Sequence, residues 1–327
     1  MKKRMWMLML PGLALVALFA HSESDQYQFK VDRSLAIPMS FQVTQLKAMQ
    51  LQLAPPRASS LRVSSLRVKS HVALIYDVQT QRPLYNKHGQ TVVPIASITK
   101  LMTAMVLLDA NLPMDVEVSV AEDELNKIRR AKSRLRVGMT LTRSEMLRLA
   151  LMASENRAAL ALARSYPGGT AALVEAMNAK ARALGMENTR FYDPTGLDSD
   201  NVSTAQDLVK MVAAASQYPL IHQYTTTASH TMDNLSGRAM RFSNTNPLVR
   251  NASWDIGLSK TGFINEAGQC LVMQATINHR PVIIVLLDSW GKRTRVGDAN
   301  RIRQWMERAP IRYVVPHSAV RLAGDFH

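Results

Sequence analysis

The chain has 327 residues and 47% of them are hydrophobic, so it is long enough for one large domain or two modest ones with an apolar core. Its 40 Lys and Arg residues against 25 Asp and Glu give a net charge of +15, which favours polyanionic partners in general. Without zinc-finger spacing, an aromatic-rich basic strand or an H-E-x-x-H motif, the sequence argues against a nucleic-acid-binding protein and against that class of metal hydrolase.

Residues 1–22 have the features of an export signal. A basic stretch, Lys2–Arg4, precedes an apolar run, Met5–Ala20, and Ala20 and Ser22 are small residues at the two positions that a signal peptidase reads. The apolar run is short for a membrane span, so an uncleaved anchor is the less favoured alternative. We therefore expect a periplasmic protein with a cleaved signal and no stable membrane span afterwards.

Residues 23–69 are predicted to be a linker or a poorly ordered segment, with a short tandem repeat, "SSLRV", at Ser59 and Ser64. Residues 70–309 are predicted to form one domain, which begins with a β-hairpin over His71–Gly89. A helix is expected from about Ser97 to Ala110, and the alternation over Val116–Val120 predicts a short strand.

The middle of the chain has strong helical signals. Thr142 and Glu145 form a capping box before an apolar run, which predicts a helix start at this point. Three further helices are predicted, ending near Pro167, Gly185 and Pro219. The helical region is therefore expected over about residues 97–218. Within it, "DPTG" at Asp193–Gly196 is predicted to be a turn that could border a functional site, with no chemical role assigned.

The final third returns to strands. "GLSKTGFI", "QCLVMQATI" and "PVIIVLLDSW" predict an antiparallel meander, with a tight turn at Asn278–His279, and "DANRIRQWMER" predicts a terminal helix. Cys270, the single cysteine, excludes an intrachain disulfide and is interpreted as a small buried hydrophobe. The element order predicts an α+β fold in which N- and C-terminal segments share one sheet beside an inserted helical region. Residues 310–327 are expected to be an irregular tail.

A serine and a lysine share one face at the start of the first predicted helix. Ser97 and Lys100 stand at i and i+3. A serine hydroxyl needs an adjacent base to become a good nucleophile, and a lysine serves as that base only when its pKa is depressed. Apolar neighbours supply the necessary desolvation: Pro94, Ile95, Ala96, Ile98, Leu101 and Met102. The Ser97 amide, at a helix N-terminus, could help to hold an oxyanion.

Two further motifs decide whether this pair has a function, because S-x-x-K alone is frequent by chance and Ser97 could be only a helix cap. "SEN", Ser154–Asn156, lies at a predicted break between two helices, and "KTG", Lys260–Gly262, lies on a predicted strand. S-x-x-K, S-x-N and K-T-G in this order are typical of penicillin-binding proteins and class A β-lactamases.

Each residue type in these motifs suits acyl transfer. Ser154 could pass a proton between Lys100 and a leaving amine, and Asn156 could orient Lys100 and bind a substrate carbonyl. Lys260 adds positive charge, which is expected to lower the pKa of Lys100 and to attract an anionic substrate group. Because Gly262 has no side chain, the strand edge can approach a substrate closely.

The sequence thus resembles the low-molecular-mass penicillin-binding proteins, which are serine D-Ala-D-Ala peptidases, and more narrowly their periplasmic D-alanyl-D-alanine endopeptidase group. The resemblance covers roughly residues 71–307. It is carried by "PIASITKLMTAMVLLDA", "LALMASENRAALALARSYPGG", "MNAKARALGMENTRFYDPTGL" and "LSKTGFINEAGQCLVM". It implies the penicilloyl-serine transferase, or β-lactamase-like, fold.

The resemblance also implies roles for residues. Ser97 would form the acyl-enzyme and Lys100 would accept its proton, while the Phe263 amide is the candidate second oxyanion donor. The other motif positions carry over as catalytic Ser154 and Asn156 and substrate-binding Lys260, Thr261 and Gly262. The implied substrate is the D-Ala to diaminopimelate cross-link of peptidoglycan, with β-lactams as covalent inhibitors and with no metal or cofactor.

Three alternatives remain open. A carboxypeptidase that trims pentapeptides would use the same chemistry, although the short sequence after the last helix favours an endopeptidase. A class A β-lactamase needs a glutamate-activated water, and the nearest match, Glu175–Asn178, lies inside a helical pattern. A non-catalytic penicillin-binding sensor could keep the same motifs for acylation alone.

Overall fold

The computed structural model describes residues 66–122, 133–233 and 236–308. They all belong to one unit, Arg57–His327, whereas the other unit, Met1–Pro56, lies wholly outside the described residues. The predicted signal at 1–22, nearly all of the predicted linker at 23–69 and the predicted tail at 310–327 therefore lie outside them too. Among the described residues, no helix is long and apolar enough to cross a membrane.

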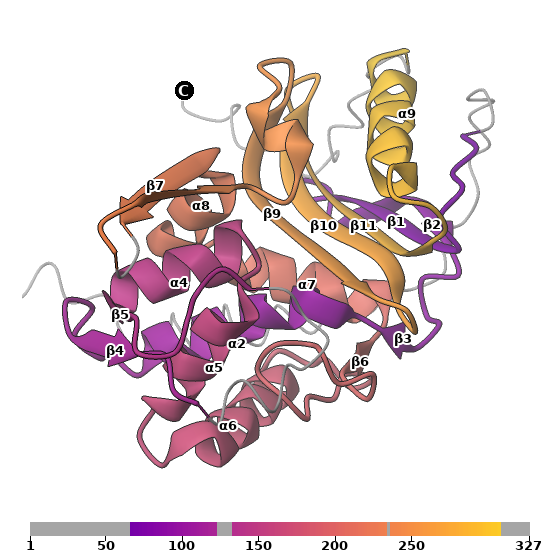
Figure 1. The fold of residues 1–327 in the computed structure, drawn as a ribbon. Helices are drawn as coiled ribbons and strands as arrows, with labels where there is room; N and C mark the ends of the chain where they lie inside the picture. The colour runs from indigo at the N-terminus through magenta and orange to yellow at the C-terminus, as the bar shows by residue number, and fades with distance from the viewer. Residues whose placement is uncertain (1–65, 123–132, 234–235, 309–327) are drawn as a thin grey trace, which may run out of the picture. The chain divides into compact units, whose positions relative to one another are not determined.

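The five-stranded antiparallel sheet joins the two ends of the domain, as the sequence predicted (Figure 1). Its strand order is β2-β1-β11-β10-β9, so the N-terminal hairpin pairs with the C-terminal meander through β1 and β11. The strands are β1 (Val72–Asp77), β2 (Arg82–Lys87), β9 (Asp255–Ile264), β10 (Gly268–Ile277) and β11 (Arg280–Ser289). Asn278 and His279 form the predicted two-residue turn, both with positive φ, as a tight hairpin turn of this kind requires.

Both faces of the sheet are covered, which explains why β1 is buried at every position. Leu74, Val272 and Val285 face the helical region, where α7 (Ala205–Ala215) packs on the sheet. On the opposite face, the main core residues come from alternate strand positions and from α9 (Thr294–Arg308), as Figure 1 shows. This alternation is the period-two pattern of a strand packed on both sides.

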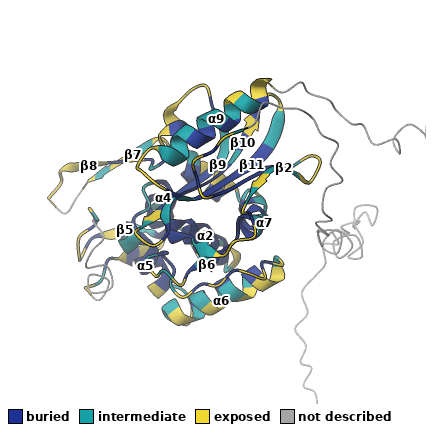
Figure 2. Ribbon diagram, turned by 90° about the vertical axis from the view of Figure 1, so that its right-hand side faces the viewer, coloured by how far each residue is buried: buried dark blue, intermediate teal, exposed yellow. Residues whose placement is uncertain are grey.

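The helical region is built around α2 (Lys100–Asp109), which is buried from Lys100 to Leu107 (Figure 2). A short 3-10 turn, η2 (Ala96–Thr99), leads into it. Around α2 lie α4 (Arg143–Met152), α5 (Asn156–Arg164), α6 (Gly169–Ala183), α7 and α8 (Pro219–Thr226). The predicted capping box is confirmed, because Thr142 Oγ1 accepts the Glu145 amide and the Glu145 carboxylate accepts the Thr142 amide.

The helical region differs from its predicted extent in two ways. Pro219, predicted to lie beyond the last helix, is the first residue of α8, where proline is favourable because its missing N–H would have no helical partner. Short strand pairs also lie before, among or after the helices; the strand predicted over Val116–Val120 is one of them, present at Glu117–Ser119, and the others were not predicted. The pairs are β3 (Val93–Pro94) with β6 (Val202–Ser203), β4 (Glu117–Ser119) with β5 (Thr140–Thr142), and β7 (Ser229–Asp233) with β8 (Ala239–Ser243).

The chain entering β1 is held to α9 by a buried carboxylate. Asp298 accepts hydrogen bonds from the amides of Lys69 and Ser70, at 2.8 and 2.7 Å, and pairs with Arg301. Ser70 Oγ donates to the same carboxylate and lies 2.7 Å from Ser289 Oγ. The last residues of the predicted linker are therefore docked on the domain. Burial alone would raise the pKa of Asp298, but these hydrogen bonds lower it below its usual value.

We predict that Asp298→Ala lowers the free energy of unfolding by about 3 kcal/mol, because it leaves buried donors without an acceptor. Since the folded-state pKa of Asp298 is depressed, its contribution is present above the usual carboxyl pKa of 3.8 and is lost as pH falls through the lower folded value. Urea unfolding followed by circular dichroism at neutral pH measures the loss. Glu307→Ala, which removes an exposed pair with Arg303 on the same helix, is the control and should change stability by less than about 0.5 kcal/mol. Equal losses in both variants would contradict this account.

Candidate active site

The three motifs predicted from the sequence meet where α2, the α4–α5 junction and β9 converge. Ser97 lies in η2 and Lys100 is the first residue of α2, so their side chains share one face as expected. Lys100 Nζ lies 2.9 Å from Ser97 Oγ. Ser154 separates α4 from α5, in the predicted helix break, and has a φ of 59°, an uncommon conformation for a residue with a side chain.

Lys100 is buried with its amine fully hydrogen-bonded. Nζ contacts three oxygens: Ser97 Oγ at 2.9 Å, Asn156 Oδ1 at 2.7 Å and the Thr195 carbonyl at 2.7 Å. These match the three donors of an ammonium group. When the amine is neutral, its lone pair can instead accept the Ser97 proton, which is the geometry that general-base activation of a serine requires.

Burial lowers the pKa of Lys100 to about 7, while the negative charges of Asp193 and Glu155 act in the opposite direction. The sequence suggested that Lys260 shares in this lowering. In the structure burial is the largest cause, and the two ammonium groups repel each other. The pKa of Lys260 is lowered well below its usual value by burial, then by the charges of Lys100 and Arg295.

Lys260 joins the second motif to the third. Its Nζ donates to Ser154 Oγ at 2.9 Å and to the Thr261 carbonyl at 2.9 Å, and its side chain is almost fully buried. Lys260 therefore contacts Ser154, and two residues further along the chain Asn156 contacts Lys100. Thr261 Oγ1 donates to Thr245 Oγ1 at 2.6 Å, which adds a hydroxyl that the sequence did not indicate.

Gly262 allows β9 to run directly against the turn that holds Ser97. A Cβ at this position would lie 2.8 Å from the Ile95 carbonyl oxygen and 3.1 Å from the Ser97 amide nitrogen, closer than side chains normally pack. The sequence predicted that Gly262 lets the strand edge approach a substrate closely. In the structure, the missing side chain also lets β9 pack against η2. Phe263 follows in β9 with 55% of its surface exposed.

Besides Thr245, three contributors to the site were not foreseen in their roles. The Thr195 carbonyl comes from the predicted "DPTG" turn, and only that turn signal marked its position. Arg295 in α9 donates to the carbonyls of Gly262, at 2.6 Å, and Cys270, at 2.9 Å, so it braces β9 and β10. Glu155 accepts a hydrogen bond from Ser133 Oγ at 2.5 Å and fixes the chain beside the second motif.

Cys270 and the Glu175–Asn178 segment lie in structural positions. Cys270 is buried, and burial raises the pKa of its thiol to about 11, which suits the interpretation as a small hydrophobe. Glu175 lies exposed in α6 and Asn178 binds the backbone of Phe191, as the helical pattern predicted. Within the described residues, no group of three or more His, Cys, Asp or Glu is placed to hold a metal ion.

Comparison with known proteins identifies the family. Residues 59–291 match the family described as D-alanyl-D-alanine carboxypeptidase, peptidase S11. The D-alanyl-D-alanine endopeptidase of Pseudomonas aeruginosa is 49% identical over 280 residues, which cover 85% of this chain and 90% of the relative. The enzyme of the same name from Escherichia coli is 47% identical over 262 residues, or 80% of this chain and 84% of the relative.

Solved structures agree with this grouping. The Streptomyces K15 DD-transpeptidase superposes with a TM-score of 0.69 at 28% identity, covering 74% of this chain and 98% of that protein. Penicillin-binding protein D2 from Listeria monocytogenes in its ampicillin-bound form gives a TM-score of 0.62 at 28% identity, with the same coverage. The predicted penicilloyl-serine transferase fold is therefore confirmed.

Acylation of this site is expected to depend on pH with a midpoint near the Lys100 pKa of about 7, because only the neutral amine can accept the Ser97 proton. Below the midpoint, the second-order rate constant for reaction with a fluorescent penicillin should fall about tenfold per pH unit. Stopped-flow measurements between about pH 5 and 9 test this, with circular dichroism at each pH as the control for folding. A flat profile, or a midpoint near the free-lysine value of 10.5, would contradict the role of a buried neutral amine.

Proposed function

The chain belongs to the D-alanyl-D-alanine carboxypeptidase family, peptidase S11, and is a serine DD-peptidase; on that premise we propose that it is an endopeptidase that cleaves D-alanyl cross-links in peptidoglycan. The observation that carries the proposal is the Lys100 amine held 2.9 Å from Ser97 Oγ by Asn156 and the Thr195 carbonyl. Two relatives that are close to half identical and nearly as long as this chain bear the name D-alanyl-D-alanine endopeptidase. That name supports the choice of endopeptidase.

The reaction begins with Ser97 as the nucleophile. Neutral Lys100 removes the Ser97 proton as Oγ forms a bond to the carbonyl carbon of the D-alanyl residue in the cross-link. The negative charge moves to the carbonyl oxygen, where the amides of Ser97 and Phe263 donate hydrogen bonds. The close packing of Gly262 on the Ser97 turn supports this pair of donors, because it brings the β9 backbone beside the Ser97 amide.

The leaving group is the amine of the neighbouring diaminopimelate residue. Ser154 transfers a proton from the lysine side to this nitrogen, the C–N bond breaks, and the acyl group remains on Ser97. Water, activated by the same Lys100, then hydrolyses the ester and regenerates the serine. Ser154 is suited to the transfer because its hydroxyl already accepts a hydrogen bond from Lys260.

Lys260, Thr261 and Gly262 form the side of the site that receives the substrate backbone and its anionic group. A substrate carboxylate there would face the amine of Lys260 near Arg295, and its negative charge would favour the protonated form of Lys260. Asn156 keeps the Lys100 amine in place and offers its amide N–H group to a substrate carbonyl. β-Lactams are proposed to acylate the same serine, which the ampicillin-bound Listeria relative supports.

A periplasmic location accompanies this function. It rests on the signal-like residues 1–22, on the peptidoglycan substrate and on the net charge of +15, which suits an anionic wall polymer. We also propose a role in cell shape, because the cleavage of cross-links alters the wall that determines it. Carboxypeptidase activity is the second candidate, because the family description and several of the more distant relatives carry that name.

We predict that the purified protein converts a cross-linked muropeptide dimer into monomers and releases little D-alanine from a pentapeptide monomer. Reversed-phase chromatography of both reactions measures the products. Ser97→Ala should lose both activities by a factor of at least about 1,000 while keeping its fold, since no other group supplies the attacking hydroxyl. Free D-alanine from pentapeptide with no dimer cleavage would identify a carboxypeptidase instead. Rapid release of hydrolysed penicillin, in place of a lasting covalent adduct, would identify a β-lactamase.

A further inference from the structure

The segment between α6 and α7 supplies a backbone group to the site although none of its residues belongs to the three motifs. The Thr195 carbonyl accepts a hydrogen bond from Lys100 Nζ at 2.7 Å, and the neighbouring Pro194 carbonyl accepts one from Thr103 Oγ1 at 2.7 Å. Two successive carbonyls thus meet two side chains one turn apart on α2. The position of this segment therefore determines where the Lys100 amine lies.

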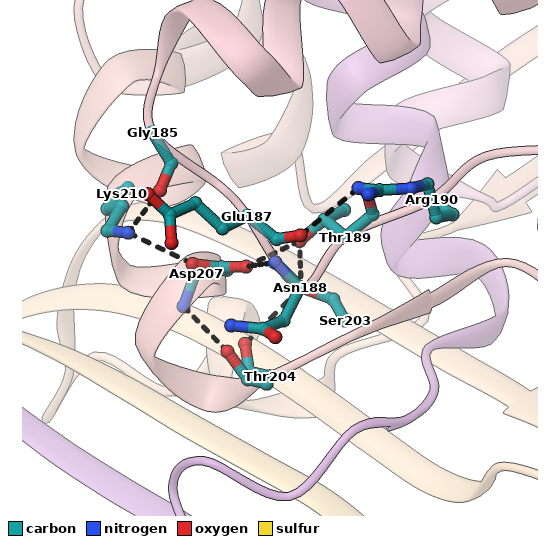
Figure 3. Close-up of polar contacts among 9 residues, drawn as sticks. All are labelled: Gly185, Glu187, Asn188, Thr189, Arg190, Ser203, Thr204, Asp207 and Lys210. Carbon is teal, nitrogen blue, oxygen red and sulfur yellow. Dashed lines mark hydrogen bonds and ion pairs between the residues drawn. The ribbon is translucent and has the colours of Figure 1, made fainter.

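Both ends of the segment are fixed at the first turn of α7. The Asn188 amide and Thr189 Oγ1 donate to Asp207 Oδ2, at 2.9 and 3.0 Å, as Figure 3 shows. Thr189 Oγ1 also lies 2.8 Å from Ser203 Oγ, so the two ends of the segment are joined to each other. Asp207 is buried, and this anchoring leaves the tip, Asp193–Leu197, as the part that reaches the site.

The tip is folded by the side chain of Asn201. Its Nδ2 donates to the Asp193 carbonyl at 2.9 Å and to Thr99 Oγ1 at 3.0 Å, while its Oδ1 accepts the amide of Tyr192 at 2.7 Å. Thr99 belongs to η2, the turn that holds Ser97, and its hydroxyl donates to the Ala96 carbonyl. Asn201 therefore connects the tip to the turn of the nucleophile.

The carboxylate of Asp193 closes the turn itself. Its Oδ1 accepts hydrogen bonds from the Gly196 amide at 2.7 Å and from Asn201 Nδ2 at 2.8 Å. Its Oδ2 accepts a hydrogen bond from Thr195 Oγ1 at 2.5 Å. Gly196 has a φ of 78°, and a Cβ there would lie 1.9 Å from the Ala96 carbonyl oxygen. The turn therefore packs closely against η2, and its Thr195 carbonyl accepts the hydrogen bond from Lys100.

We propose that Asp193 is a positioning residue for the acylation of Ser97: its carboxylate holds the Asp193–Leu197 turn so that the Thr195 carbonyl keeps the Lys100 amine on the serine. The inference rests on the proposed function, because it concerns the same nucleophile and base. Asp193 touches neither Ser97 nor a substrate and acts through the backbone of its own turn.

The charge of Asp193 gives this role a signature that a purely structural residue would not have. Two carboxylates act on Lys100: Asp193 and Glu155, which lies at the α4–α5 junction. The neighbouring Lys260 is affected by the positive charges of Lys100 and of Arg295 in α9. Burial lowers the pKa of Lys100. The charges of Asp193 and Glu155 raise it, and Asp193 has the larger effect of the two. Loss of this charge therefore lowers the pKa further, and acylation persists to lower pH.

Two substitutions separate geometry from charge. In Asp193→Asn, the amide oxygen can still accept the Gly196 amide and the NH₂ group can donate to Thr195 Oγ1. The fold of the turn and the plateau rate of acylation should stay within about twofold of wild type, with the pH midpoint moved to lower values. In Asp193→Ala the turn loses its closure, and the plateau rate constant should fall at least about tenfold because Lys100 is no longer held on Ser97.

The experiment measures acylation by fluorescent penicillin against pH for wild type and the two variants. Asp198→Asn is the matched control, because its exposed carboxylate lies in the same segment and accepts the Asp200 amide. The control should keep both the midpoint and the plateau of wild type. A wild-type plateau in Asp193→Ala, or an unmoved midpoint in Asp193→Asn, overturns the proposal, and if the alanine variant does not fold the asparagine variant decides alone. Failure of the wild-type protein to be acylated at all would instead refute the proposed function.

Discussion

The active site depends on one energetically unfavourable arrangement, a lysine amine buried beside a serine hydroxyl. An ammonium group removed from water loses its hydration, and the protein compensates with three oxygen acceptors around Lys100 Nζ and two carboxylates nearby. These partners do not fully offset the loss of hydration, so the pKa of Lys100 is lowered to about 7. A base that is partly neutral near physiological pH is the useful result, since a fully solvated lysine would stay protonated.

The three hydrogen-bond partners of this amine come from separate parts of the helical region. The buried helix α2 supplies the lysine and η2 the serine, the α4–α5 junction supplies Asn156, and the α6–α7 segment supplies the Thr195 carbonyl. The sheet adds Lys260 through β9, which Arg295 of α9 braces from the other face. The pairing of β1 with β11 joins the N-terminal hairpin to the C-terminal meander, whose first strand, β9, borders the site. Groups distant in sequence thus converge on a single nitrogen atom.

Sequence patterns predicted the parts of the structure that depend on local chemistry. The spacing of Ser97 and Lys100, the Thr142–Glu145 capping box and the Asn278–His279 turn each involve neighbours along the chain, so residue types alone indicate the conformation. The three motifs in their order, which are typical of penicillin-binding proteins, predicted one shared site, and the contacts of Lys100 and Lys260 join them.

The remainder depends on tertiary contacts that leave little or no local signal. The Thr195 carbonyl is a backbone group, and any residue type would provide it. Arg295 lies in an ordinary helical pattern, and nothing in the sequence around it indicates its hydrogen bonds to two strand carbonyls. Pro219 is compatible with either the end of one helix or the start of the next, and the packing of α8 on α4 and β9 selects the start. The attachment of Ser70 to Asp298 joins residues at opposite ends of the domain, for which no sequence periodicity exists.

The most direct test of the central claim is to locate the covalent adduct formed with benzylpenicillin by proteolysis and mass spectrometry of the folded protein. This account predicts one penicilloyl group, on the peptide that contains Ser97 and Lys100, attached at the serine oxygen. Replacing Lys100 with methionine, which preserves the length and burial of the side chain without the amine, should abolish the adduct. An adduct on any other residue, or undiminished acylation of Ser97 in that variant, would contradict the account.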